Sequence, residues 1–206
     1  MIRLVLASAS PARLATLRAA GIEPLVQVTG VDEDAVLAAT RARGPVSASQ
    51  SVAALARAKA RAAAAGADAL VLGCDSLLEF SGDTYGRPAD AADAVARWRR
   101  MRGRSGVLHT GHCLVDARSR GAGAVVEATS STVVHFAALS EAEIDAYVAT
   151  GEPLAVAGAF TVDGLGGPFV TGIEGDYHGV VGLSLPVLRD LLGRLGISIT
   201  DLWTGP

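Results

Sequence analysis

The chain has 206 residues and a formal net charge of −3, and half of its residues are hydrophobic although only 4% are aromatic. This length suits one domain or two closely packed lobes, while the weak charge and the scarcity of aromatic side chains argue against a nucleic-acid-binding protein. No apolar run reaches the ~18 residues of a membrane span and no signal-peptide pattern opens the chain, so we expect a cytoplasmic protein with no membrane partner.

The N-terminal segment predicts a strand over residues 3–6, followed by a helix that begins after Ser10 and Pro11. Ser10 suits the N-cap, and Pro11 suits the first helical position, where its missing N–H is not needed. Free backbone N–H groups point out of such a helix start, and Ser8, Ser10 and Arg13 stand beside it. This combination predicts a site for phosphate oxygens, although an ordinary N-cap with a surface arginine gives the same local pattern.

Apolar strands and amphipathic helices alternate along the rest of the chain, which predicts an α/β fold. Helices are expected over about residues 52–65, 90–101, 140–149 and 185–195, and strands over 69–73, 77–80, 107–117 and 124–136. Residues 24–31 are expected to be extended, residues 40–51 to form a loop, and residues 200–206 to form a tail. Without a repeat or a flexible linker, a single domain over residues 1–206 with two lobes that share one sheet is favoured.

Asp75 and Lys59 are candidates for chemistry. Asp75 follows the predicted strand over residues 69–73, and sites in open α/β sheets gather beyond the carboxyl ends of strands. Its carboxylate could bind Mg²⁺, take a proton from water, or merely cap the next turn. Lys59 shares the apolar face of its helix with Val52 and Leu55. An ammonium there must either snorkel to solvent or meet an anion.

Arg87 and Glu33 extend this set. Arg87 lies in a rigid Gly-Arg-Pro turn, and Glu33 is one of three successive acidic residues. The candidate phosphate-binding residues are therefore Ser8, Ser10, Arg13, Lys59 and Arg87, and the candidate carboxylates are Glu33 and Asp75. The cations can hold a triphosphate, and the acids can hold a metal ion and activate water. This set of residues indicates metal-assisted hydrolysis of a phosphoanhydride bond.

Ordered motifs over residues 4–197 resemble the Maf family of nucleoside triphosphate pyrophosphatases. They include Leu6-Ala7-Ser8-Ala9-Ser10-Pro11 with Arg13, Val31-Asp32-Glu33, Ala58-Lys59-Ala60, Gly86-Arg87-Pro88, Ile173-Glu174-Gly175-Asp176-Tyr177 and Val180-Val181-Gly182-Leu183. The resemblance implies hydrolysis of a nucleoside triphosphate to the monophosphate and pyrophosphate. It also implies an elongated mixed β-sheet flanked by helices, two lobes with a central cleft as in the inosine triphosphatase fold, and a homodimer.

The resemblance also implies roles for individual residues. Asp75 would accept the proton of the attacking water, and Glu33 and Asp75 would hold a divalent cation such as Mg²⁺, Mn²⁺ or Co²⁺. Ala12, Ser76 and Asp163 occupy the positions associated with base choice and match neither well-known subfamily fully. An ionised Asp163 offers only acceptors, so it favours bases with N–H donors, such as cytosine or guanine.

Two other functions stay open at this point. A nucleotide-binding regulator of septum formation would hydrolyse its ligand slowly or incidentally, and a phosphotransferase would use the same pocket to modify an acceptor. The presence of Asp75, Lys59 and Glu33 favours a hydrolase, because a sensor needs no acid that activates water. We therefore expect an enzyme that clears non-standard or modified nucleotides and has no nucleic-acid partner.

Overall fold

The computed structural model describes residues 2–121 and 123–204. Its strands are β1 (Leu4–Leu6), β2 (Leu25–Val26), β3 (Leu70–Phe80), β4 (Asp83–Tyr85), β5 (Ser105–Asp116), β6 (Val125–Phe136) and β7 (Val170–Glu174). They form a seven-stranded sheet in the order β2-β1-β3-β5-β6-β7, with β4 paired to β3. β1 pairs in parallel with β2 and β3, and the other pairs are antiparallel. The predicted α/β class with a mixed sheet is confirmed.

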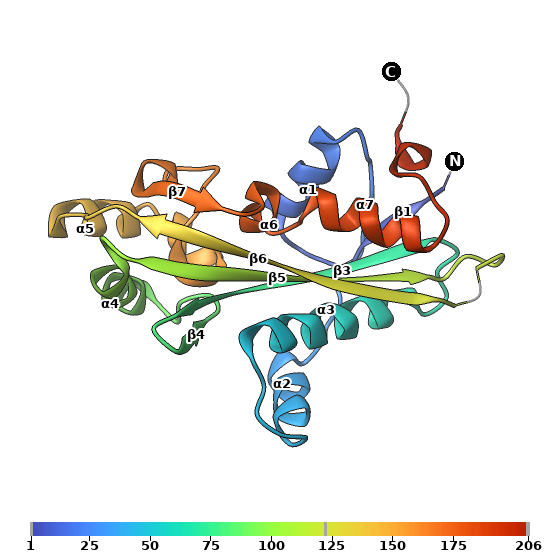
Figure 1. Ribbon diagram of the computed structural model, residues 1–206, viewed down its shortest axis with the longest axis horizontal. Helices are drawn as coiled ribbons and strands as arrows, with labels where there is room; N and C mark the ends of the chain where they lie inside the picture. Colours follow the sequence, from blue (N-terminus) through green and yellow to red (C-terminus); the bar gives the residue numbers. More distant parts are fainter. Residues whose placement is uncertain (1, 122, 205–206) are drawn as a thin grey trace.

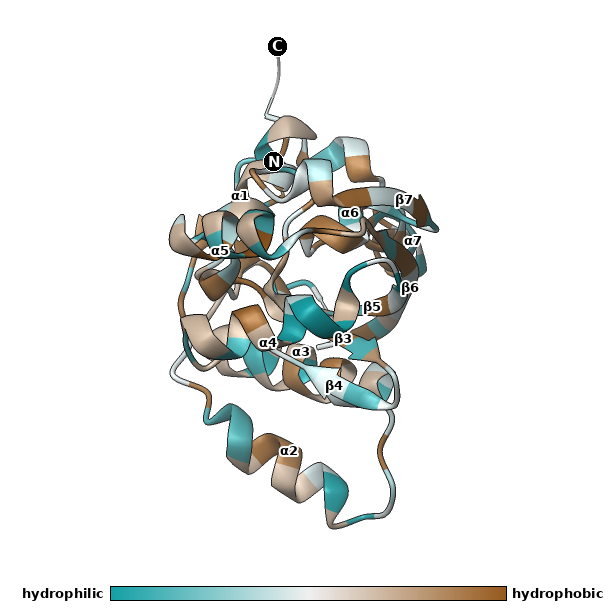
Figure 2. Ribbon diagram, turned by 90° about the vertical axis from the view of Figure 1, so that its left-hand side faces the viewer, coloured by the Kyte–Doolittle hydropathy of each residue, from teal (hydrophilic) through white to brown (hydrophobic). Residues whose placement is uncertain are grey.

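Helices flank both faces of this elongated sheet. They are α1 (Pro11–Ala19), α2 (Glu33–Arg41), α3 (Ala48–Ala64), α4 (Ala91–Met101), α5 (Glu141–Ala149), α6 (Tyr177–Val181) and α7 (Leu185–Arg194), with 3₁₀ turns η1 (Glu152–Ala155), η2 (Ala157–Ala159), η3 (Gly167–Phe169) and η4 (Ile199–Leu202). α1, α6 and α7 lie on one side of the sheet, and α3 lies on the other with α2 projecting beyond it (Figures 1 and 2). Among the described residues, no helix is long and apolar enough to cross a membrane.

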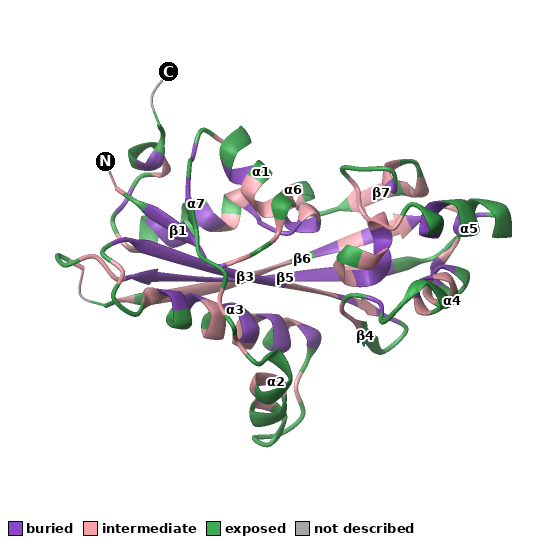
Figure 3. Cartoon of the chain, turned by 180° about the vertical axis from the view of Figure 1, so that it is seen from behind, coloured by how far each residue is buried: buried purple, intermediate pink, exposed green. Residues whose placement is uncertain are grey.

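β3 and β5 are buried along most of their length (Figure 3), and apolar clusters pack around both ends of the sheet. At the end that carries β1, Leu72 belongs to a cluster with Leu188 of α7. At the opposite end, Trp98 of α4 donates its indole N–H to the carbonyl of Ala159 at 2.8 Å and packs edge-on against Phe136 at 5.6 Å. The two clusters anchor the long strands on either side of their midpoint.

Two glycines let α3 approach the sheet closely. A Cβ added at Gly73 would lie 2.2 Å from the carbonyl oxygen of Ala56 and 2.7 Å from the amide nitrogen of Ala60. A Cβ at Gly111, on the neighbouring strand, would lie 2.5 Å from the backbone of Val52. The backbone of α3 therefore rests directly on β3 and β5, which brings the side chains of this helix within reach of the strand residues beside Gly73.

The structure corrects the prediction for the strand around Asp75. Residues 69–73 and 77–80 do not form two strands, because the antiparallel pairing of β3 with β5 continues without a break from Leu70 to Glu79. Asp75 consequently lies within a strand and not beyond the carboxyl end of one. β3 continues into β4 through a tight hairpin, in which Ser81 and Gly82 both have positive φ angles.

The loop predicted over residues 40–51 is shorter at both ends, because α2 continues to Arg41 and α3 begins at Ala48. Ser47 and Gln50 form a capping box that starts α3 before the apolar pattern begins. Asp32 caps the start of α2, and the acidic first turn of this helix suits the helix dipole. At the other end of the chain, Leu202 is buried and residues 199–202 form η4, so they pack on the body and are not a tail; residues 205–206 lie outside the described residues.

Replacing Gly73 with alanine is expected to destabilise the protein by about 1–3 kcal/mol, because the new methyl group would push α3 off the sheet. Gly193→Ala in α7 is the matched control: its added Cβ meets nothing within 4 Å, and alanine favours the helix by up to about 1 kcal/mol. Urea unfolding of both variants measures the difference. Equal midpoints for Gly73→Ala and the parent chain would show that α3 is not held at this distance.

Candidate active site

An unpaired stretch of β3 is the centre of the candidate site. β5 pairs with one edge of β3 along almost its whole length. On the other edge, β1 pairs only with Leu70–Leu72 and β4 pairs only with Leu78–Phe80. Among the described strands, residues 73–77 therefore have no partner on this edge. Asp75 lies at the middle of the gap, where a ligand can reach the strand between its two neighbours.

Lys59 joins the two predicted carboxylates on the α3 side of this gap. Its Nζ lies 2.6 Å from Oδ1 of Asp75 and 2.7 Å from Oε1 of Glu33. The side chains of Lys59 and Asp75 are 14% and 11% exposed, whereas that of Glu33 is 52% exposed. Lys59 thus meets anions and does not snorkel to solvent. Glu33 is the first residue of α2, so a helix with no buried residue supplies the second acid.

Burial governs the acidity of Asp75. It raises the pKa of the Asp75 carboxyl, and the positive charges of Lys59 and Arg13 offset this rise only in part. A carboxylate with a raised pKa is a better proton acceptor than an ordinary aspartate. The arrangement therefore provides a base that lies on an open strand edge beside a cation.

Arg13 binds the other side of the gap. Ser10 caps α1, and its hydroxyl accepts the backbone N–H of Arg13. The guanidinium of Arg13 donates to Oγ of Ser8 at 3.0 Å, the carbonyl of Cys74 at 2.9 Å, Oγ of Ser76 at 3.1 Å and the carbonyl of Gly182 at 2.8 Å. Four of its five N–H groups are used in this way. Arg13 consequently fixes the loop of Ser8 and Ser10 against the free edge and keeps its positive charge beside it.

Ser76 helps to hold Arg13 in place by accepting one of its N–H groups. Its hydroxyl lies 2.8 Å from the hydroxyl of Thr110, which itself donates to the carbonyl of Gly179 at 2.8 Å. Because the only hydrogen of the Thr110 hydroxyl is directed to Gly179, Ser76 must donate to Thr110 while it accepts from Arg13. Ser76, which the resemblance linked to base choice, therefore has its hydrogen-bonding capacity engaged in holding Arg13.

The remaining predicted residues lie in two other places. Arg87 is exposed in its turn, and no contact of its side chain with Asp75 or Lys59 is found within residues 2–121 and 123–204. Ala12 and Asp163 line one cavity between α1 and α6. Tyr177 also lines this cavity, although the sequence analysis named it only as part of a motif. An aromatic residue directly after Gly175-Asp176 was the available signal.

Glu33 and Asp75 form a donor pair that suits a divalent cation. Both carboxylates converge on one point, which the ammonium group of Lys59 occupies. Carboxylate oxygens are the ligands that Mg²⁺ prefers, and one or two of them with phosphate oxygens and water complete its usual coordination. The described residues contain no group of three or more possible protein ligands. The pair therefore fits an ion that is held jointly with a phosphorylated substrate.

Known proteins similar to this chain share its full length. A model of the Maf family, described as Maf-like protein, matches residues 3–195. A nucleoside triphosphate pyrophosphatase from Salinispora tropica is 61% identical over 98% of this chain and 88% of its own. One from Streptomyces coelicolor is 56% identical over 98% and 94%. A solved structure of a dITP/XTP pyrophosphatase from Mycobacterium abscessus is 15% identical over 95% and 96%, with a TM-score of 0.42.

Asp75→Asn is expected to unfold at a higher denaturant concentration than the parent chain at pH 8, by roughly 1 kcal/mol in free energy. Because folding raises the pKa of Asp75, the folded chain binds this proton more tightly than the unfolded chain does. Stability is therefore lost as the pH rises from the unfolded pKa of this carboxyl through its folded pKa, and the full cost is present above the folded pKa. Asparagine removes that cost, and Glu33 remains to pair with Lys59.

Urea unfolding at pH 8 and at successively lower pH measures this difference, which should shrink as the parent carboxyl takes up its proton. A variant that is less stable than the parent at pH 8 would mean that the ion pair with Lys59 outweighs the burial of the charge.

Proposed function

The chain belongs to the Maf-like protein family, and from this premise we propose that the free edge of β3 is the active site of a nucleoside triphosphate pyrophosphatase. The chain hydrolyses a nucleoside triphosphate to the monophosphate and pyrophosphate, as the names of its relatives state for those proteins. The observation that carries the proposal is the position of Asp75. It is a buried base at an open strand edge, with Lys59 on one side and Arg13 on the other.

The two cations are placed to hold the phosphates of the substrate. Arg13 presents its charge beside the loop of Ser8 and Ser10, and one of its N–H groups has no acceptor in the described residues. Lys59 carries three N–H donors, and it can turn one from a carboxylate to a phosphate oxygen. Arg87 stands in an exposed turn after β4 and would add a third positive charge for the same phosphates. These charges neutralise the pyrophosphate that leaves.

Asp75 acts on the attacking water. Its carboxylate accepts a proton as the water oxygen bonds to the α-phosphorus, and the bond from that phosphorus to the bridging oxygen breaks. The electron pair of this bond leaves with pyrophosphate, and the water oxygen stays on the monophosphate. Lys59 keeps the carboxylate of Asp75 oriented through their 2.6 Å contact. Burial of Asp75 restricts bulk water around the reacting group.

Glu33 and Asp75 are the residues that would hold a divalent cation. Such an ion supplies positive charge to the phosphate oxygens and increases the acidity of water. Mg²⁺ is the ion that this oxygen pair favours, and Mn²⁺ and Co²⁺ are the other ions to compare.

The other functions considered from the sequence gain no support here. The curated relatives carry the name of an enzyme, which favours hydrolysis over a septum regulator. A phosphotransferase would need an acceptor site beside Asp75. Clearance of non-standard nucleotides, a cytoplasmic location and a homodimer stay predictions.

Asp75→Asn is expected to lower kcat for pyrophosphate release by about 10²–10⁴-fold, because the amide cannot accept the proton of water. KM should change by no more than a few-fold, since the amide keeps an oxygen for Lys59. Asp145→Asn, an exposed carboxylate on α5, is the control and should be fully active. Undiminished turnover in Asp75→Asn would remove this residue from the mechanism.

Removal of divalent cations with a chelator is expected to abolish pyrophosphate release, and Mg²⁺ should restore it. In Glu33→Gln, the Mg²⁺ concentration for half-maximal rate should rise about tenfold, because a neutral amide binds the ion more weakly than a carboxylate does. Titration of the rate against free Mg²⁺ measures this shift. Full activity in excess chelator would contradict the assignment of Glu33 and Asp75 as a metal-binding pair.

A further inference from the structure

His112 is a buried titratable residue that the proposed mechanism does not use. It lies on β5, has no exposed surface, and shares one face of the sheet with Thr110, two residues earlier on the strand. Its Nε2 accepts the backbone N–H of Ser184 at 2.8 Å. Because a backbone amide can only donate, Nε2 carries the lone pair and the neutral ring carries its hydrogen on Nδ1. The contact therefore specifies one tautomer of this histidine.

This hydrogen bond is one of two that tie the polypeptide around the linking segment, residues 182–184 between α6 and α7, to β5. Thr110 donates to a carbonyl of α6 at 2.8 Å, and His112 accepts from Ser184 directly before α7. Gly182 lies between these two attachment points, and its carbonyl accepts the Nε–H of Arg13 at 2.8 Å. β5 thus holds the acceptor of Arg13 from both sides along the chain.

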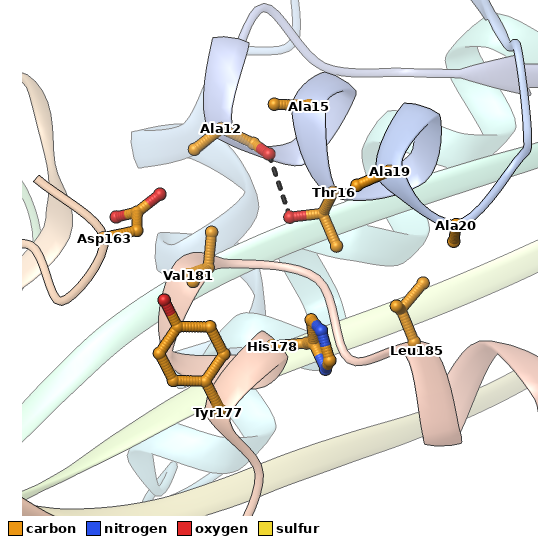
Figure 4. Close-up of a pocket in the computed structure, with 10 residues that line it drawn as sticks. All are labelled: Ala12, Ala15, Thr16, Ala19, Ala20, Asp163, Tyr177, His178, Val181 and Leu185. Carbon is orange, nitrogen blue, oxygen red and sulfur yellow. Dashed lines mark hydrogen bonds between the residues drawn. The ribbon is translucent and has the colours of Figure 1, made fainter.

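The linking segment has open space on the side of α1. Val181 and Leu185 flank the segment, and together with Ala12 of α1 they line a cavity of about 310 Å³ (Figure 4). A cavity wall lacks the close contacts that fix most buried backbone. The position of the Gly182 carbonyl therefore depends on the hydrogen bonds to β5, as well as on the buried side chain of Leu183.

The surroundings of His112 keep its ring neutral. Burial lowers the pKa of His112 to about 4, the positive charge of Arg13 lowers it further, and Asp176 acts in the opposite direction. A protonated ring would point an N–H group at the N–H of Ser184 and lose the contact. At pH values well above 4, His112 therefore keeps the lone pair that Ser184 requires.

We propose that His112 is a positioning residue for the hydrolysis: it holds the linking segment on β5, so that the carbonyl of Gly182 keeps the guanidinium of Arg13 directed toward the phosphates. The proposal rests on the proposed function, in which Arg13 binds those phosphates. Because His112 has no exposed surface, it cannot contact a nucleotide itself. Its effect on the reaction passes through Arg13.

Pyrophosphate release by full-length variants tests this role. His112→Leu, which has a similar volume but no acceptor, should lower kcat at least about tenfold, because a displaced Arg13 neutralises the leaving group less well. His112→Gln, whose side-chain oxygen can accept the same N–H, should stay within about threefold of the parent chain. If His112→Leu does not fold, His112→Asn replaces it with the same expectation, because the shorter amide does not reach Ser184.

Two controls separate positioning from a general loss of structure. Val134→Ala opens a space in the apolar cluster at the opposite end of the sheet, and it should keep its kcat as long as it stays folded. Arg13→Lys lacks the guanidinium that binds Gly182. In this background, His112→Leu should lower kcat by no more than about a further twofold, because the two residues act as one unit.

Three results would overturn the proposal while the proposed function stands. They are full activity of His112→Leu, equal losses in His112→Leu and His112→Gln, and losses from His112 and Arg13 that multiply in the double variant. ¹⁵N NMR of the parent chain tests the contact itself, which requires the hydrogen on Nδ1. A hydrogen on Nε2 would remove the bond to Ser184 and the proposal with it.

If the parent chain releases no pyrophosphate from any triphosphate, the proposed function fails instead. The calorimetric Kd of inorganic triphosphate then decides whether His112 positions Arg13. His112→Leu should weaken this binding at least about fivefold, and His112→Gln should stay within about twofold of the parent chain. Equal binding by all three chains, or no binding by the parent chain, would overturn the role of His112.

Discussion

The free edge of β3 is the constraint on which the rest of the site depends. β1 ends at Leu6 and β4 begins only at Asp83, so the strand that carries Asp75 is paired on one side and open on the other. An open edge inside a sheet leaves backbone groups without a strand partner. In this chain the guanidinium of Arg13 binds one of them, the carbonyl of Cys74, at 2.9 Å. The same contact that satisfies the edge therefore places a cation beside Asp75.

Close packing of α3 provides the second cation. The glycine at position 73 and the alanines that face it allow the helix backbone to contact the strand, and Lys59 follows on the same helix. The ammonium of Lys59 then lies between Asp75 and Glu33 with little exposure to solvent. Burying these charges together opposes folding unless they remain paired. The site thus holds paired charges in an otherwise apolar sheet, and a phosphorylated ligand with a divalent cation can satisfy the same groups.

Local patterns predicted the fold class and most of the helices and strands, whereas the roles of the site residues stay predictions. The helix expected over residues 140–149 is an example, because Ser140 and Glu143, three residues apart, form a capping box at its start. The position of Asp75 within β3 did not follow from local patterns, because a run of polar residues looks like the end of a strand unless the long-range pairing with β5 is known. The role of Ser76 was hidden for the same reason, since its partners Arg13 and Thr110 are far away in the sequence. Tyr177 lines the cavity between α1 and α6 only through tertiary packing.

A crystal structure with a nucleoside triphosphate whose α,β-bridging oxygen is replaced by a methylene group is the most direct test of the central claim. The account predicts that the triphosphate lies along residues 73–77 of β3, with the α-phosphorus next to the carboxylate of Asp75 and phosphate oxygens bound by Lys59 and Arg13. Phosphates bound away from this edge, or an α-phosphorus out of reach of Asp75 through one water molecule, would contradict it.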